Sequence, residues 1–339
     1  MFNHELEKEI MINILIIYTI VSFLLLFLIS KLSYKLNLVD KPSKRKIHSR
    51  PVAFTGGLII SFLYIFSIYL FDNNDLSLII SIALLIAIVG FIDDIFYLNI
   101  VNKLSLQIIP IFYLIIINDF NLVSIGYYGF FKLNLNSFSI PFTLLAVAFL
   151  INSFNYFDGL DGTLGFTSIS VIAILYFLTF NKNFELYLII LLIPLLAFLF
   201  FNFSIFNLPK LFLGDSGSLL LGFVIAFTLI YISNQNIVHP ILLAWSVVIF
   251  VYEFLSVNLI RIQTKKNIFN AGFDHLHHII FKKNKSIFLT NFLISITNII
   301  LFIIGYLSFK IINPFTSLIL FICFFIIFYT LRKKSLKQS

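Results

Sequence analysis

The densest chemical signal in the sequence is a run of polar residues that emerges from an apolar segment. Asn152, Asn155, Asp158 and Asp161 follow one another at intervals of three, and a glycine stands after each aspartate. Three residues turn an α-helix by about 300°, so neighbouring members share roughly one face until the glycines allow a tight bend. Carboxylate and amide oxygens at this density suit a hard cation such as Mg²⁺, or the hydroxyl groups of a sugar and a nucleotide.

Two further acidic groups stand where apolar runs end or begin. Asp93 and Asp94 are adjacent at the end of one run, and carboxylates at a membrane boundary are costly unless they are paired with a cation, a proton or a metal. Asp215 is the only acid of the loop Phe-Leu-Gly-Asp-Ser-Gly-Ser and directly precedes another run. A helix that starts there offers free N–H groups to an anion, with Asp215 facing a metal held between that anion and the protein. The alternative is that Asp215 or Ser216 merely caps the helix.

Two cationic segments complete the set. Residues 40–51 hold five Lys and Arg within ten positions, among them Lys46, close to His48; such a cluster favours phosphate or lipid head groups, or simply fixes topology. A long loop holds His275, His277 and His278. His275 and His278 lie one helical turn apart, which suits phosphate as well as zinc. Because the loop has no cysteine and no H-E-x-x-H motif, a zinc hydrolase is disfavoured.

These clusters must be positioned by a membrane-embedded framework. Of the 339 residues, 60% are hydrophobic and 11% are charged, and the mean hydropathy is +1.05, whereas about a quarter of the residues of a soluble domain are charged. The apolar runs are continuous rather than alternating, which excludes a β-barrel. Cys323 is the only cysteine, so neither an intramolecular disulfide nor a thiolate metal site can form. The predicted fold class is an all-α polytopic membrane protein.

The apolar runs predict about 10–11 transmembrane helices in a single domain that covers residues 1–339. A helix needs roughly 20 residues to cross a hydrocarbon core about 30 Å thick, and the run around Pro110 is both short and open to a kink. Residues 118–138 are expected to form a small hairpin with Gly126 and Gly129 at its turns. The predicted spans are 11–30, 56–71, 76–92, 104–117, 139–154, 163–180, 186–203, 216–233, 238–257, 287–306 and 312–331.

The distribution of cations predicts the orientation of these helices. If the N-terminus lies outside and the spans alternate, all but four of the 23 Lys and Arg fall on the inner side, as the positive-inside rule requires. The C-terminus is then cytoplasmic, and every dense polar cluster lies on the cytoplasmic face. The first run lacks the basic start and the cleavage site of a signal peptide, so we expect it to be retained. The net charge of +8 is mostly this topology signal and predicts no nucleic-acid partner.

The five clusters in this order resemble one family. The sequence is similar to the polyprenyl-phosphate N-acetylhexosamine-1-phosphate transferases, the WecA, TagO and MraY group of glycosyltransferase family 4. The resemblance covers roughly residues 38–280, and it is carried by K-P-S-K-R-K-I-H followed by G-G, then D-D, N-x-x-N-x-x-D-G-x-D-G, F-L-G-D-S-G-S and H-L-H-H. It implies a multi-pass enzyme of the bacterial plasma (inner) membrane with cytoplasmic catalytic loops, and it leaves open whether that enzyme is a homodimer.

The resemblance also implies a role for each cluster. Asn155 and Asp215 would hold Mg²⁺, for which Mn²⁺ can substitute. Asp93 would orient or deprotonate the lipid phosphate and Asp94 would support the metal or the nucleotide, so Asp93, Asp94 and Asp215 are the catalytic candidates. The candidate substrate-binding residues are Lys46, His48, Lys103, Asn152, Asp158, Asp161, His275, His277 and His278.

The reaction implied by the resemblance is a sugar-phosphate transfer. The enzyme would move an N-acetylhexosamine-1-phosphate, GlcNAc-1-phosphate first, from a UDP-sugar to undecaprenyl phosphate and release UMP. Because two polyanions meet, such a site must supply cations and positioning. This is the first membrane step toward a cell-envelope glycan such as the O-antigen of lipopolysaccharide or teichoic acid. A double displacement through an aspartyl-phosphate stays open. The alternatives are a MraY-like phospho-muramoyl-pentapeptide transferase, a catalytically inactive homologue and a membrane transporter.

Three positions depart from the family pattern. Tyr97 stands where relatives often have a third acid, and Phe54 and Phe273 stand where relatives usually have arginines. Asp274 restores an acid beside Phe273 but not a cation. The lost arginines bear on which sugar the enzyme would accept.

Overall fold

The computed structural model describes residues 2–42, 49–70, 73–180, 184–267, 272 and 274–338. Helices account for most of these residues, and the four short strands form two antiparallel pairs. The all-α fold class expected from the sequence is therefore confirmed. The predicted site residues Lys46 and His48 lie outside the described residues, as does Phe273.

The elements follow the apolar runs in chain order. The α-helices are α1 (Phe2–Lys35), α2 (Gly56–Phe66), α3 (Asn74–Phe96), α4 (Ile100–Phe112), α5 (Ser139–Phe157), α6 (Thr163–Leu178), α7 (Glu185–Asn202), α8 (Gly214–Asn234), α9 (Pro240–Ser246), α10 (Val248–Gln263), α11 (Leu276–Asn284), α12 (Ile287–Ile311) and α13 (Pro314–Gln338). The strands are β1 (Val39–Asp40), β2 (Val52–Ala53), β3 (Ser124–Tyr127) and β4 (Lys132–Asn134), and the short helical turns are η1 (Ser67–Leu70), η2 (Tyr113–Ile117), η3 (Asn136–Phe138) and η4 (Ile205–Asn207).

Each predicted span corresponds to a helical segment. In the described part of the chain, 8 helices are long and apolar enough to cross a membrane, or up to 9 if the bent pair α9 and α10 is one span. The predicted spans 56–71 and 163–180 are the shorter apolar helices Gly56–Leu70 and Thr163–Leu178. The predicted apolar segments are thus all helical, but fewer than the predicted 10–11 have the length of a full crossing.

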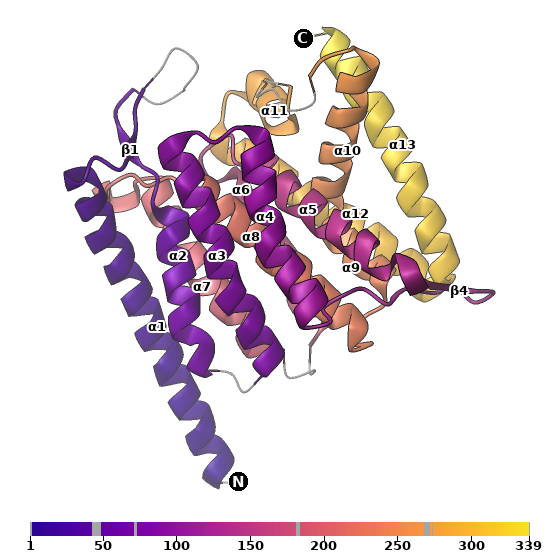
Figure 1. Cartoon of the computed structure of the whole chain (residues 1–339), viewed down its shortest axis with the longest axis horizontal. Helices are drawn as coiled ribbons and strands as arrows, with labels where there is room; N and C mark the ends of the chain where they lie inside the picture. Colours follow the sequence, from indigo (N-terminus) through magenta and orange to yellow (C-terminus); the bar gives the residue numbers. More distant parts are fainter. Residues whose placement is uncertain are drawn as a thin grey trace.

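Helix α8 forms the centre of the bundle, and α2, α3 and α5 pack around it. Almost its whole length is buried, as expected of a helix that is apolar on all sides. Helices α1 and α13 lie at opposite edges of the bundle and are mostly exposed, as helices that face lipid are (Figure 1). The two termini lie at opposite ends of the bundle (Figure 1), which agrees with an odd number of passes.

Two glycines bring the backbones of α2 and α3 against the first turn of α8. A Cβ on Gly90 would lie 2.4 Å from the carbonyl oxygen of Asp215, and a Cβ on Gly57 would lie 1.9 Å from the backbone nitrogen of Gly217. Small residues at such crossings are a common device in membranes, where lipid supplies no hydrophobic force between helices. These contacts fix the start of α8, and Asp215 with it, beside the end of α3.

One buried asparagine stabilises the break between α9 and α10. The two helices are bent by 73° at a break of one residue, Val247. Asn298 of α12 donates from Nδ2 to the carbonyl oxygen of Ser246 (3.0 Å), and its Oδ1 accepts from the N–H of Ile249 (3.3 Å). Backbone groups freed by a helix break inside a membrane need such partners. The predicted span 238–257 is therefore one broken segment rather than a straight helix.

The segment 118–138 contains the expected hairpin. Strand β3 pairs with β4, and Gly129 lies in the connecting turn, where the N–H of Tyr128 donates to the carbonyl of Phe131. Gly126 lies at a register irregularity within β3 and not at a turn. The kink expected at Pro110 takes the form of a π-helical stretch, Tyr113–Ile117, immediately after it.

We expect Gly90→Ala to lower the stability of the bundle. The new methyl group would overlap backbone atoms of Asp215, which cannot rotate away, and overpacking of this kind costs about 1–3 kcal/mol. The midpoint of thermal unfolding in detergent measures the effect, with Leu85→Ala, on the exposed side of the same helix, as the control. An unchanged midpoint for Gly90→Ala would contradict the close approach of α3 and α8.

Candidate active site

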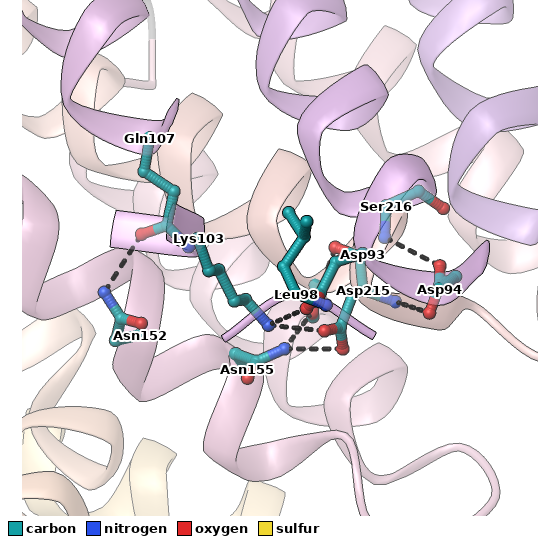
Figure 2. Close-up of polar contacts among 10 residues, drawn as sticks. Asp93, Asp94, Leu98, Lys103, Gln107, Asn152, Asn155, Asp215 and Ser216 are labelled. Carbon is teal, nitrogen blue, oxygen red and sulfur yellow. Dashed lines mark hydrogen bonds and ion pairs between the residues drawn. The ribbon is translucent and has the colours of Figure 1, made fainter. Parts of the chain in front are cut away.

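One ammonium group bridges two carboxylates at the end of the bundle. The Nζ atom of Lys103, near the start of α4, lies 2.8 Å from Oδ2 of Asp93 and also pairs with Asp215 (Figure 2). The side chains of Lys103, Asp93 and Asp215 are 15%, 10% and 30% exposed, so their charges are only partly hydrated. Charges in such a place require partners. Lys103 supplies the cation that the aspartates at the end of α3 need.

Asp94 binds the N-terminus of α8. Its Oδ1 accepts from the N–H of Asp215 (3.0 Å) and its Oδ2 from the N–H of Ser216 (3.3 Å) (Figure 2). Gly214 permits this contact, because its φ is +72° and a Cβ there would lie 2.6 Å from Asp94 Oδ2. The two N–H groups that we expected to be free for a substrate anion are thus taken by a carboxylate of the protein, which is favourable at a helix N-terminus. For these two N–H groups the expectation was wrong, and no side chain at the N-cap position of α8 replaces Asp94.

The two asparagines of the polar run have different partners. Asn155 donates to Oδ1 of Asp215 (2.9 Å) and to the hydroxyl of Ser218 (2.8 Å), so it holds the aspartate from the side of α5 (Figure 2). Asn152 donates to Oε1 of Gln107 on α4 (3.2 Å). The nitrogen of Asn155, and not its oxygen, faces Asp215. Its assignment as a metal ligand stays a prediction.

The turn between α5 and α6 carries the other two aspartates of the run. Asp161 pairs with Lys210 (2.6 Å), and its carbonyl oxygen accepts from Nδ2 of Asn291 on α12 (2.7 Å). Asp158 follows the last residue of α5, and its side chain stays accessible to solvent. The surrounding protein still removes much of its hydration, and this desolvation, together with the negative charges of Asp215 and Asp161, raises the pKa of Asp158 to about 7. The protonation of Asp158 therefore depends on the charge of Asp215, one of the two aspartates paired with Lys103.

The histidine motif, which comprises His275, His277 and His278, packs against the same turn. His277 is 1% exposed, and its Nε2 lies so close to Gly159 that a Cβ there would be 2.2 Å away. Burial, and then the charges of His278 and His275, lower the pKa of His277 well below its usual range. Burial and His275 likewise lower the pKa of His278 to about 4. Both imidazoles are thus neutral near pH 7 in the free protein and offer N–H groups rather than charge.

Segments far apart in the sequence therefore meet at one end of the bundle. The ends of α3 and α5, the starts of α4 and α8, and α11 all lie there (Figure 1). Strand β2 joins them, because the N–H of Phe212 donates to the carbonyl of Ala53 (2.7 Å). The contact of Lys46 and His48 with phosphate, predicted from the first cationic segment, concerns residues outside the described ranges.

A family comparison matches the part of the chain that holds the carboxylates. The model for glycosyl transferase family 4 matches residues 76–233, a range that contains Asp93, Lys103, Asn155 and Asp215. Over this range the chain is similar to glycosyl transferase family 4. The resemblance noted in the sequence is confirmed, and the histidine motif lies beyond the matched range.

Several bacterial proteins are similar to this chain over most of its length. Those of Salmonella typhi and Escherichia coli (strain K12) are both 27% identical to it, over 268 and 271 residues, which are 76% of this chain and 72% and 73% of the relatives. A protein of Yersinia pestis is 26% identical over 271 residues, 77% of this chain and 74% of the relative. All three carry the name undecaprenyl-phosphate alpha-N-acetylglucosaminyl 1-phosphate transferase.

The residues of this site suit Mg²⁺ held together with a substrate. Among the residues that the structure describes, no group of three or more His, Cys, Asp and Glu could hold a metal ion. Mg²⁺, however, is usually bound by one or two carboxylates and substrate phosphates rather than by a cage of protein groups. Asp93 and Asp215 offer hard oxygen atoms that already share one cation, the ammonium of Lys103. The donor set therefore fits Mg²⁺ with a diphosphate better than it fits a preformed zinc site.

Several residues at the site were not predicted from the sequence. Lys210 pairs with Asp161 and Gln107 with Asn152, while Glu253 and Arg332 lie beside the histidine motif. A lysine or arginine between spans satisfies the positive-inside rule whatever it contacts, so its partner is not visible in the sequence. Glu253 does carry a signal, because it is the lone acid of an apolar run and intramembrane acids are functional candidates.

We expect Lys103→Gln to destabilise the protein in the absence of divalent cations. It leaves Asp93 and Asp215 without their shared cation, and breaking such a partly buried pair costs about 3 kcal/mol. Millimolar Mg²⁺ should restore part of the loss by taking the place of the ammonium group. Thermal unfolding with and without Mg²⁺ measures both effects, and Lys132→Gln in the exposed strand β4 is the control. Equal midpoints for the two variants would show that the bridge contributes no stability.

The raised pKa of Asp158 predicts a stability that falls as the pH rises. Between its ordinary pKa of 3.8 and its folded pKa of about 7, the folded protein binds a proton at Asp158 that the unfolded chain releases. The contribution of Asp158 to the free energy of unfolding therefore declines across this window. Asp158→Asn should remove that decline. The midpoint of unfolding of the variant, measured relative to that of the wild type, should therefore be higher at about pH 7.5 than at about pH 5. The same difference between the variant and the wild type at both pH values would contradict the prediction.

Proposed function

We propose that this chain transfers an N-acetylhexosamine-1-phosphate, with GlcNAc-1-phosphate as the first candidate, from a UDP-sugar to undecaprenyl phosphate and releases UMP. The observation that carries the proposal is the group of Asp93, Lys103, Asn155 and Asp215 at the ends of four apolar helices. This group lies inside the range matched by glycosyl transferase family 4. The names of the bacterial relatives support a polyprenyl-phosphate acceptor and a GlcNAc-1-phosphate donor group.

The reaction forms one bond to phosphorus and breaks another. A phosphate oxygen of the lipid attacks the sugar-side phosphorus of the UDP-sugar, the bond between that phosphorus and the bridging oxygen breaks, and UMP leaves with that oxygen. The acceptor is a phosphate monoester that is already ionised near neutral pH, so the site must position and neutralise anions more than it must remove a proton. A cation flanked by carboxylates is suited to this task.

Three residues of the site have distinct parts in the proposed reaction. Lys103 would neutralise phosphate charge, because its ammonium group is held at the end of the bundle by two aspartates. Asp93 would orient the acceptor phosphate or Lys103, and it is itself fixed by the N–H of Leu98 (2.8 Å). Asp94 positions the start of α8 and through it Asp215.

Mg²⁺ is the proposed cofactor, with Asp215 as its main protein ligand and Asn155 beside it. When bound, it would neutralise the diphosphate and stabilise the charge that develops on the departing UMP. Asn155 holds one oxygen of Asp215, which restricts the orientations the carboxylate can adopt.

The donor would bind where the histidine motif meets the turn between α5 and α6. Asp158, with its pKa near neutrality, can both donate and accept hydrogen bonds to hydroxyl groups. The neutral side chains of His277 and His278 can donate N–H groups to phosphate oxygens. Asp161 is held by Lys210, so its oxygen atoms are fixed before a sugar or nucleoside binds.

In this proposal the site faces the cytoplasm of a bacterial inner membrane, with the N-terminus outside. The cation-rich ends of α1 and α10 and the helix α11 lie at the same end of the bundle as the site (Figure 1). Lys and Arg concentrate on the cytoplasmic side of membrane proteins. The product would enter the synthesis of a cell-envelope glycan such as O-antigen or teichoic acid.

The test is release of UMP by the purified protein in detergent. With UDP-GlcNAc, undecaprenyl phosphate and Mg²⁺, we expect UMP that depends on the lipid and disappears with a chelator. Asp215→Asn should lower the rate about 100-fold or more, because it removes a charge from the reacting centre. Asp119→Asn, the same change at an exposed residue between η2 and β3, should leave the rate unchanged.

A panel of donors separates the proposal from its alternatives. Activity only with a UDP-muramoyl-pentapeptide would make the chain a phospho-muramoyl-pentapeptide transferase. If a folded protein releases no UMP from any UDP-N-acetylhexosamine or from the pentapeptide donor, the proposed activity is wrong and the chain is an inactive homologue.

A further inference from the structure

A lone carboxylate inside α10 is paired with the last helix of the chain. Glu253 is 1% exposed, and its Oε1 lies 2.6 Å from Nη2 of Arg332 on α13, which is 3% exposed. Both residues lie outside the range matched by family 4. Burying two charges is costly, and a buried pair can be replaced by apolar side chains without loss of stability. Stability alone therefore gives no reason for a charged pair at this place.

The pair also holds the backbone on both sides of His275. Oε1 of Glu253 accepts from the N–H of Leu276 (2.8 Å), and Nη2 of Arg332 donates to the carbonyl oxygen of Asp274 (2.6 Å). Within the described part of the chain, Nε and Nη1 of Arg332 find no partner, so its hydrogen bonds are directed at Glu253 and Asp274. The two ions thus contact the chain directly before and after His275.

A second arginine anchors the same segment through its side chain. Arg261 of α10 binds Asp274 with two hydrogen bonds, Nη2 to Oδ1 (2.7 Å) and Nε to Oδ2 (3.0 Å). Such a bidentate contact fixes the orientation of a carboxylate as well as its position. Figure 1 shows that α10 and α13 end at the same end of the bundle as α11. Asp274–Leu276 is therefore held by charged groups from two membrane helices.

The hydrogen bond from Leu276 sets where α11 begins. Leu276 is the first residue of α11, and a carboxylate at a helix N-terminus stabilises the first turn. That turn carries His277 and His278, and His277 packs against Gly159 in the turn that carries Asp158 and Asp161. A shift of the start of α11 would move His277 away from that turn.

We infer that Glu253 and Arg332 are positioning residues that form a buried clamp between α10 and α13. The clamp holds Asp274–Leu276 and thereby sets His275, His277 and His278 against the turn between α5 and α6. In this position the three histidines bind the diphosphate of a nucleotide donor. The donor part of this inference rests on the proposed function. The positional part concerns only the arrangement of the histidines. The C-terminal helix, although it is mostly exposed, is thereby part of the donor site.

The test replaces both ions at once with apolar side chains. Either single variant leaves an unpaired buried charge and is expected to unfold the protein, whereas Glu253→Leu with Arg332→Met removes both charges and keeps the volume similar. Thermal unfolding verifies that the double variant folds. Lys333→Met, the same kind of change at the exposed neighbouring residue on α13, is the matched control.

The first measurement does not depend on activity. Diethyl pyrocarbonate modifies accessible neutral imidazoles, and mass spectrometry counts the modified sites. His275 and His277 are 8% and 1% exposed, so the wild type and Lys333→Met should resist modification at both, and the folded double variant should be modified at both. His239, at the N-cap of α9 and in contact with Tyr127 of β3, is the internal reference and should react equally in all three proteins. Unchanged protection of His275 and His277 in a folded double variant would overturn the clamp.

The second measurement assigns the clamp to the donor. The double variant should raise the KM for the UDP-sugar about 10- to 100-fold and leave the KM for the lipid phosphate within about twofold, because small displacements of binding groups carry costs of this size. An equal rise in the KM for the UDP-sugar and the KM for the lipid phosphate would show that the clamp does not act specifically on the donor site. If the wild type releases no UMP while the labelling pattern is as expected, the proposed function fails and the clamp is supported as a device that orders the histidines.

Discussion

The structure depends on how carboxylates are neutralised at the end of an apolar bundle. Asp93 and Asp215 share the ammonium group of Lys103, while Asp94 binds the N-terminus of α8 and Asp161 binds Lys210. Each of these four acids has a partner from another helix or loop. The ends of α3 and α5 and the starts of α4 and α8 must therefore lie together at one end of the bundle. This requirement places an ammonium group and several carboxylates close together, where the proposed phosphate transfer would occur.

Close packing of backbones makes this meeting possible. Gly57 and Gly90 bring α2 and α3 against the first turn of α8, and without them Asp94 could not reach the N–H groups of that turn. Two asparagines of α12, seven residues apart and so on one face of the helix, serve the rest of the framework. Asn291 binds the carbonyl oxygen of Asp161, and Asn298 binds the backbone at the break between α9 and α10. These polar side chains inside the bundle thus form hydrogen bonds with backbone groups at or beside the breaks between helices.

The molecule divides into two parts that contribute differently to the site. The range matched by glycosyl transferase family 4 ends at residue 233 and contains the aspartates, Lys103 and Asn155. The helices that follow supply the histidine motif and the three charged residues that surround it, Glu253, Arg261 and Arg332. His277 of the second part packs against Gly159 of the first part, and Asn291 of the second part binds the carbonyl oxygen of Asp161. In the proposed reaction the first part would serve the metal and the acceptor, and the second part the nucleotide donor.

The sequence by itself determined the helical class, the position of each apolar segment and the family resemblance. Hydrocarbon imposes length and hydropathy on every segment separately, and the acidic motifs lie within short stretches of chain. The sequence also indicated the hairpin at 118–138. Only the tertiary structure decided which cation serves which acid, since Lys103 and Lys210 look alike between spans. It also decided that Asp94, and not a substrate, takes the N–H groups of α8, and that Arg332 meets Glu253 across 79 residues of chain. Spacing reports which residues share a face of one helix, whereas pairing between helices depends on how closely and at what depth their backbones cross.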